Sequence, residues 1–182
     1  RGIIKFKQQD KINALKDLEL AHGIKPHLKQ LWDIIIKLQI ELNRFDDVLE
    51  MSNKLLKIEP NNEIHYFNSG LSNHKLLNID TAIKNYEKAI QLNPENALTY
   101  QNIGSALQDS GDLKAALKNY QKAIEINPNF AAAYSNAGNI LKMLKDFDAA
   151  IKNLENALKL EPKSIIFIKN IASVYFNQGN YK

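Results

Sequence analysis

Residues 97–130 read ALTYQNIGSALQDSGDLKAALKNYQKAIEINPNF. In the first half of this segment, apolar and small side chains recur at i, i+3, i+4 and i+7, as on one face of a helix: Tyr100, Ile103, Gly104 and Leu107. Gly111 and Asp112 then supply a turn residue and a candidate N-cap for a second helix. Pro128 closes the unit, because proline lacks a backbone donor and disfavours helix in the residue before it. The segment predicts a pair of helices joined by a tight turn.

The same unit recurs through the 182 residues. The five prolines are evenly spaced along the chain, and their consecutive numbers differ by 34: Pro26, Pro60, Pro94, Pro128 and Pro162. Small residues recur at the same interval: Gly70, Gly104 and Gly138; Ala82, Ala116 and Ala150; Ala89, Ala123 and Ala157. A glycine inside a helix costs roughly 0.5–1 kcal/mol relative to alanine, so its recurrence predicts that a neighbouring helix presses against it. A period of 34 is typical of helix–turn–helix units stacked into a solenoid.

We therefore predict an all-α, right-handed superhelical solenoid of antiparallel helix pairs, forming a single array over residues 1–182. Its units are a partial repeat at 1–28, a divergent repeat at 29–62, three repeats at 63–96, 97–130 and 131–164, and a partial repeat at 165–182. Both ends fall inside a repeat, so we expect the sequence to be part of a longer array.

Two units depart from the pattern. In the divergent repeat Ile36 stands at the glycine position, and Val48 and Leu55 replace the two alanines. We expect these larger side chains to push the paired helices apart or to change their crossing angle. In the opening segment Gly2, Ala14 and Ala21 stand at the repeat positions, which predicts the second half of a repeat with its second helix near residues 11–22.

Composition excludes several classes of function. The chain is 45% hydrophobic and 24% charged, without a segment apolar enough to span a bilayer, as in an ordinary soluble protein. Cysteine is absent, which excludes disulfides and thiolate chemistry and suits a reducing compartment, so we expect a cytoplasmic protein. The net charge is +4, but only Arg1 and Arg44 among the 24 basic residues are arginines. This scarcity argues against sequence-specific nucleic-acid binding.

No catalytic pattern is present in the sequence. The glycines stand at repeat positions rather than in a phosphate-binding loop, and the four histidines lack the i, i+4 spacing of a helical metal pair: His22, His27, His65 and His74. Four carboxylates stand at the start of predicted second helices: Asp46, Asp47, Asp146 and Asp148. We interpret them as helix N-caps and as charges that interact favourably with the helix dipole. We predict that the chain is not an enzyme and has no catalytic residue, metal site or cofactor.

The order of aromatic, glycine, alanine and proline positions resembles the tetratricopeptide repeat (TPR), over essentially the whole chain and most clearly over residues 64–175. This resemblance implies a module that binds another protein or peptide along a concave face lined by the first helices of the repeats. Residues 129–139, NFAAAYSNAGN, are similar to the repeats of O-linked N-acetylglucosamine transferases, in which an asparagine ladder holds substrate peptides.

Four asparagines on the predicted first helices recur with the repeat period: Asn68, Asn102, Asn136 and Asn170. A side-chain amide can pair with both the C=O and the N–H of an extended peptide, so these four, with Asn139 and Lys169, are the predicted peptide-binding residues. The alternative is that the asparagines bridge adjacent repeats or are simply hydrated. The lysine and arginine clamp by which some TPR domains grip an acidic C-terminus is missing from the groove positions.

Two columns of lysines recur with the repeat period on the predicted second helices: Lys84, Lys118 and Lys152; Lys54, Lys88 and Lys122. We expect them to lie on a solvated convex face, and the alternative is that they bind an anionic partner. Two hypotheses for function follow. The chain is a recognition module, which can serve as the substrate-holding arm of a larger transferase, or it is a structural scaffold that self-associates through its repeats.

Overall fold

The computed structural model describes residues 2–24 and 29–180, and over these ranges it consists of ten helices and no strand. The first five helices are α1 (Gly2–Ile24), α2 (Lys29–Glu41), α3 (Phe45–Ile58), α4 (Glu63–Lys75) and α5 (Ile79–Leu92). The other five are α6 (Ala97–Asp109), α7 (Leu113–Ile126), α8 (Ala131–Met143), α9 (Phe147–Leu160) and α10 (Ile165–Asn180). The prediction of an all-helical repeat array is confirmed.

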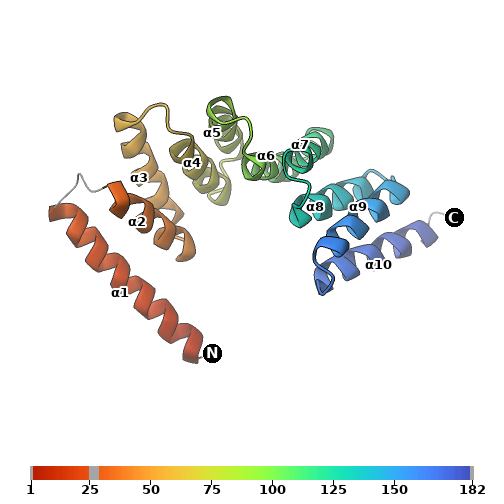
Figure 1. Cartoon of the computed structure of the whole chain (residues 1–182), viewed down its shortest axis with the longest axis horizontal. Helices are drawn as coiled ribbons and strands as arrows, with labels where there is room; N and C mark the ends of the chain where they lie inside the picture. The colour runs from red at the N-terminus through yellow and green to blue at the C-terminus, as the bar shows by residue number, and fades with distance from the viewer. Residues whose placement is uncertain (1, 25–28, 181–182) are drawn as a thin grey trace.

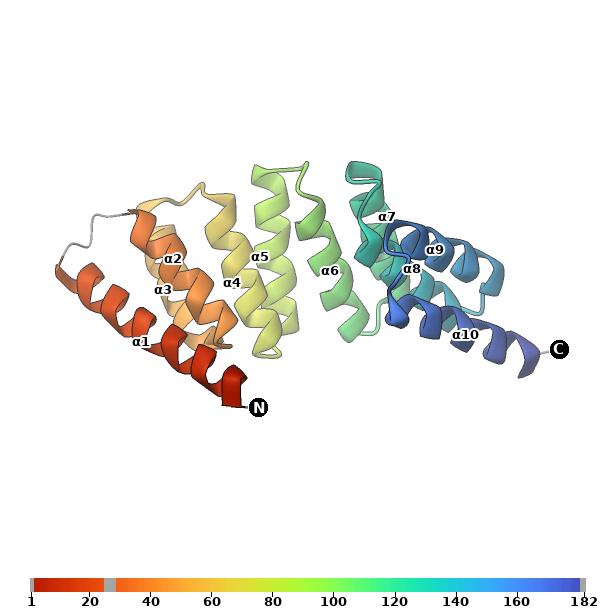
Figure 2. The ribbon, with the colours of Figure 1, turned by 60° about the horizontal axis from the view of Figure 1, so that its bottom comes forward.

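The helices form an arch with α1 at one end and α10 at the other (Figure 1). The first helices of the units, α2, α4, α6, α8 and α10, lie towards the inner side of the arch, and α3, α5, α7 and α9 lie towards its outer side (Figure 1). Figure 2 shows the same helices side by side in chain order, so each unit packs on the next and the core runs through the array.

The second helices of the units end close to the prolines. The last residues of α3, α5, α7 and α9 each precede a proline by two positions: Pro60, Pro94, Pro128 and Pro162. Pro26 lies outside the described residues. Within each unit the two helices join through one residue with positive φ, and these residues again recur with the repeat period: Asn43, Leu77, Gly111 and Lys145. In every case the next residue donates its N–H to a carbonyl five residues earlier, for example Asp112 to Leu107 at 2.9 Å, which is a Schellman-type helix end.

The predicted contact at the glycines is confirmed. A Cβ added to Gly70 would lie 2.6 Å from a ring carbon of Tyr86, and one added to Gly104 would lie 2.7 Å from Tyr120. The alanines of the second helices are buried, as helices in such close contact require: Ala82, Ala116 and Ala150; Ala89, Ala123 and Ala157.

The divergent repeat packs differently from the units that follow it. The contact between α2 and α3 is much smaller than that within the three following helix pairs. Ser52 stands one repeat period before Tyr86, so the glycine–tyrosine pair of the next two units is replaced here by Ile36 and Ser52, and both are buried. In this repeat the large side chain of the pair is on the first helix, whereas in the next two units it is on the second helix. Val48 and Leu55 fill the remaining space together with Trp32.

The two end helices are longer than the repeat predicts. The opening segment has no turn before residue 11, because α1 runs unbroken from Gly2 to Ile24 through Gln9, which stands one repeat period before the turn residue Asn43. Gln9 instead donates its side-chain amide to Asn13 within the helix, at 3.2 Å. At the other end α10 continues through Gly179, the corresponding position. A reversal needs a partner helix to pack back on, and no described helix supplies one at either position.

Candidate functional site

The predicted peptide-binding residues all lie on first helices. Asn68 is on α4, Asn102 on α6, Asn136 and Asn139 on α8, and Lys169 and Asn170 on α10. Asn68 is almost fully buried, with 7% of its surface exposed, whereas Lys169 is exposed and the other four are half-buried. The four ladder asparagines therefore occupy one repeat position on the helices that line the inner side of the arch (Figure 1).

The ladder amides have different local partners. The Asn102 side-chain amide donates to the Leu98 carbonyl of its own helix at 2.8 Å. The Asn170 amide donates to the Ser135 hydroxyl on α8 at 3.3 Å, so this asparagine bridges two successive first helices. In both bonds the asparagine uses one of its two N–H donors, and its carbonyl oxygen remains an acceptor. Neither contact consumes the amide's capacity to pair with a peptide.

Asn68 lines a hollow between α2 and α4 with a volume of about 300 Å³. Ile36, Ile40 and Ile64 form its apolar part, and Asp33, Lys37 and Glu41 are its charged residues. Glu41 also pairs with Lys11 of α1 at 2.6 Å, and this pairing lowers the pKa of the Glu41 carboxyl. The inner surface thus has a small pocket at its N-terminal end, beside the first asparagine of the ladder.

Polar bridges fix the spacing of the first helices elsewhere. His74 on α4 lies 2.8 Å from a carboxylate oxygen of Asp109 on α6, and the Lys142 ammonium on α8 donates to the Ser173 hydroxyl on α10 at 3.2 Å. The sequence pattern placed Ser173 at a groove position and excluded a metal pair for His74, but it predicted neither bridge. The signal was weak, because each bridge joins residues about one repeat apart that differ from one unit to the next.

A second asparagine column was missed by the sequence analysis. Asn85, Asn119 and Asn153 recur with the repeat period on the second helices α5, α7 and α9. Each amide donates to the carbonyl four residues earlier in its own helix at 2.9 Å: Thr81, Ala115 and Ala149. This column is chemically matched to the ladder and lies on the other set of helices.

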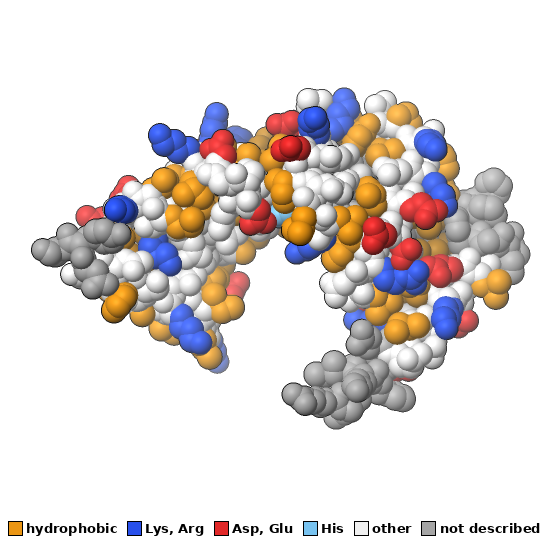
Figure 3. Space-filling view, turned by 180° about the vertical axis from the view of Figure 1, so that it is seen from behind, with side chains coloured by type: hydrophobic (Ala, Val, Ile, Leu, Met, Phe, Trp, Pro, Cys, Tyr) orange, Lys and Arg blue, Asp and Glu red, His pale blue; other side chains and the backbone are white. Residues whose placement is uncertain are grey.

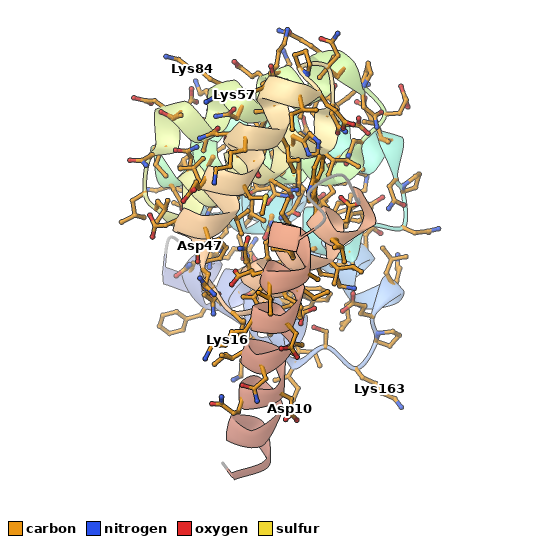
Figure 4. All side chains as sticks on the ribbon, turned by 90° about the vertical axis from the view of Figure 1, so that its left-hand side faces the viewer. Asp10, Lys16, Asp47, Lys57, Lys84 and Lys163 are labelled. Carbon is orange, nitrogen blue, oxygen red and sulfur yellow. The ribbon has the colours of Figure 1, made fainter. Side chains whose placement is uncertain are left out.

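The lysine columns point outward, as predicted for a solvated face. All six of these lysines are exposed, and blue side chains occur along the outer rim of the arch in Figure 3. Figure 4 shows Lys57 and Lys84 extending away from α3 and α5. Some of the charges are paired: Lys54 lies 2.6 Å from Glu50, which lowers the pKa of Glu50, and Lys122 lies 3.1 Å from Glu125, which raises the pKa of Lys122.

Within the described ranges, no three metal-binding side chains gather at one point, and no helix is both long and apolar enough to cross a membrane.

Comparison with protein families gave matches to two repeat models. Residues 78–111 and 104–145 match a TPR model, and residues 131–164 match a tetratricopeptide-repeat model. Residues 78–164 therefore match tetratricopeptide repeats. The matched residues are those in which the sequence pattern is most regular. A comparison with curated proteins found no match.

Solved TPR-like structures share the fold of the array. A crystal structure of MamA is 24% identical, with a TM-score of 0.75, and the match covers 87% of this chain and 93% of MamA. The TPR protein TTC0263 of Thermus thermophilus is 17% identical with a TM-score of 0.76, covering 96% and 95% of the two chains. The first TPR domain of Spaghetti (RPAP3), solved with the HSP90 peptide SRMEEVD, is 23% identical with a TM-score of 0.62, covering 64% of this chain and 93% of that domain.

Proposed function

We propose that this chain is a non-catalytic recognition module that binds an extended segment of another polypeptide along the inner side of its arch. The observation that carries the proposal is the asparagine ladder, which repeats once per unit on four successive first helices. Neighbouring first helices lie roughly 10 Å apart in such packing. An extended chain advances about 3.3 Å per residue, so one amide meets the peptide every third residue.

The chemistry of the ladder favours a ligand of relaxed sequence preference. Amide side chains pair with peptide backbone, which all sequences share, and each net hydrogen bond contributes about 0.5–1.5 kcal/mol. The pocket beside Asn68 has apolar walls and adds a place for one side chain of the peptide. Lys169, which is exposed and without a partner among the described residues, adds a positive charge at the other end.

The acidic peptide SRMEEVD, bound by the Spaghetti domain, is a useful negative control. The groove positions of the three middle units carry no lysine or arginine: Phe67 and Leu71; Gln101 and Ser105; Ser135 and Asn139. We expect SRMEEVD to bind this chain much more weakly than the best peptides of an unbiased library, because its carboxylates find no cluster of cations here.

The decisive experiment compares two double variants against an unbiased library of unstructured peptides. Asn102→Ala with Asn136→Ala removes two ladder amides. We expect this double variant to weaken the binding of the selected peptides by about 1–3 kcal/mol, or roughly 5- to 150-fold in affinity. Asn85→Ala with Asn153→Ala removes two amides of the outer column and is expected to leave binding unchanged. Equal affinity of both double variants and the parent chain contradicts the ladder as the peptide-binding surface.

The finer proposal is that the array is the substrate-holding arm of a larger cytoplasmic transferase of the O-linked N-acetylglucosamine type. It rests on the similarity of residues 129–139 to such repeats and on the position of Asn136 on α8. Peptides chosen from the library should then contain serine or threonine with no fixed flanking sequence. A consensus without hydroxyl residues contradicts this role while leaving the ladder itself intact.

Self-association is a second candidate function, and the surface of α10 favours it. Apolar side chains on this helix are largely exposed, including Ile168 at 50% and Phe176 at 71%. These two residues are eight apart and therefore share a helix face. We expect Ile168→Glu with Phe176→Glu to abolish any concentration-dependent mass increase in sedimentation, and Lys163→Glu, an exposed control, to leave it unchanged. A mass that stays monomeric for the parent chain contradicts self-association.

A further inference from the structure

The outer side of the arch contains a groove that neither the ladder nor the repeat pattern accounts for. It has a volume of about 940 Å³, which is three times that of the pocket beside Asn68. Its two walls are α5 and α7, and α6, which packs against both, forms its floor. Figure 1 shows α6 between these two helices.

The floor of the groove is apolar. Tyr100, Ile103 and Leu107 of α6 form it together with Ile83 and Ile90 of α5. Apart from Ile103, these side chains are only half-buried, so the groove leaves apolar surface in contact with water. One unit later, the side chain that corresponds to Leu107 is more buried: Leu141 is only 8% exposed and packs with Ala150 and Leu154.

The two walls carry opposite charges that the chain does not neutralise. Glu87 on α5 and Lys118 on α7 both line the groove and are exposed, and neither has an ion-pair partner among the described residues. They do not pair with each other across the groove. The other charged pair on the rim, Lys122 and Glu125, is satisfied within α7 at 3.1 Å.

We propose that this groove binds an amphipathic helix of a partner protein, with a basic side chain on the flank beside Glu87 and an acidic one on the flank beside Lys118. A helix suits the groove because its backbone groups are already hydrogen-bonded, so it can bury an apolar face without leaving amides unpaired. An extended peptide lacks this advantage here, because the walls and floor are helices and offer no strand edge. Lying between α5 and α7, the partner helix packs as ridges into grooves.

The charges specify which helices bind best. A helix with lysines along one flank and glutamates along the other matches both walls in one of its two directions. A helix with glutamates on both flanks meets Glu87, and one with lysines on both flanks meets Lys118, so each of these has one repulsive wall. Charge complementarity of this kind selects partners more than it adds affinity.

The test uses three synthetic helices of about 20 residues, long enough to be helical when stapled. All three carry the same leucine stripe and differ only in their flanks: mixed, all glutamate or all lysine. On the parent chain we expect the mixed helix to bind about three- to tenfold more tightly than the other two at low salt. Equal affinity of the three helices, or no saturable binding up to about 1 mM, overturns the proposal.

Charge reversal then locates the site. Glu87→Lys makes both walls basic and is expected to shift the preference to the all-glutamate helix, while Lys118→Glu shifts it to the all-lysine helix. The matched controls are Glu155→Lys and Lys152→Glu, which reverse exposed charges on α9, two repeats after Glu87 and one repeat after Lys118. Controls that change the preference as strongly as the groove variants overturn the proposal, because the charges then act from a distance.

A third variant separates this groove from the inner surface. Ala115 lines the α7 wall and is half-buried, so Ala115→Trp is expected to fill the groove and weaken the mixed helix roughly tenfold or more. Asn102→Ala with Asn136→Ala should leave this helix bound as tightly as before. If the double asparagine variant no longer binds the mixed helix and the Ala115→Trp variant still binds it, the helix binds the inner surface and the proposal is wrong.

Discussion

At the scale of single residues, Gly70, Gly104 and Gly138 on the first helices leave no room for a side chain. Gly104→Ala places a methyl group 2.7 Å from the Tyr120 ring, which is itself buried. We expect a loss of about 1–3 kcal/mol in the free energy of unfolding from overpacking, despite the better helix propensity of alanine. Chemical denaturation measures this change. Gly179→Ala is the control, because its added Cβ meets nothing within 4 Å, and it should cost nothing.

The tyrosines that cover these glycines make stability depend on pH. Burial raises the pKa of Tyr120 to about 12, outweighing the hydrogen bond with Ser105, which lowers it, and burial also raises the pKa of Tyr86. The unfolded chain ionises near pH 10, where the folded chain still holds its proton. The stabilisation is therefore complete below pH 10 and is lost as pH rises towards 12.

Melting temperatures measured between about pH 9 and about pH 12 test this dependence. This range includes the tyrosine pKa of the unfolded chain, about 10, and reaches the pKa of folded Tyr120, about 12. We expect Tyr120→Phe to be slightly less stable at neutral pH, because the tyrosine hydroxyl donates to Gln108 at 3.1 Å. Its melting temperature should fall less steeply with rising pH than that of the parent chain. Tyr175→Phe, at an exposed tyrosine, should keep the parent slope. Parallel slopes for all three chains would refute the argument.

At the scale of helices and turns, the repeat period predicts much of the fold because backbone geometry recurs with it. The helix ends before the prolines and the close contact at Gly70 and Gly104 follow from residue type alone. The positive φ of Leu77 and Lys145 does not, since neither residue favours that conformation. Packing of the paired helices imposes these turns, and a local sequence carries no signal for them.

The candidate site was predictable to a similar extent. The repeat period placed the asparagine ladder on first helices, where the structure has it. The outer groove was not predictable, because its volume depends on how far α5 and α7 lie apart across α6. The bridge from Asn170 to Ser135 was left open as one of two alternatives, because it depends on which rotamers the neighbouring helix allows.

The divergent repeat offers an element-scale test of complementary packing. We expect Ile36→Gly to cost about 3 kcal/mol or more by opening a cavity, and Ser52→Tyr to cost about 1–3 kcal/mol by overpacking. The double variant restores the glycine–tyrosine arrangement of the next two units and should cost less than the sum of the two single variants. A double-mutant cycle of unfolding free energies measures this coupling. Strict additivity would show that the two positions do not share one space.

At the scale of the whole molecule, stability is expected to be uneven along the array. A solenoid unfolds according to the strength of each unit and of each interface with its neighbours. The α2–α3 contact is small, and the surrounding helices bury polar atoms that lack a hydrogen bond: Gln39 Oε1, Ser52 Oγ, His65 Nδ1 and Ser72 Oγ. Each such atom costs about 1–3 kcal/mol. The N-terminal units should therefore open while the later ones stay folded.

Hydrogen exchange measures this opening helix by helix. The fair comparison is α3 with α8, because each is third from its end of the ten described helices and so is equally affected by fraying. We expect the most protected amides of α3 to exchange about 5- to 150-fold faster than those of α8, the range that one unpaired buried group produces. Ser52→Ala removes one such group and should narrow the difference. Equal protection of α3 and α8 would mean that the array unfolds as one cooperative unit, in which the buried polar atoms without a hydrogen bond have no separate effect on the N-terminal units.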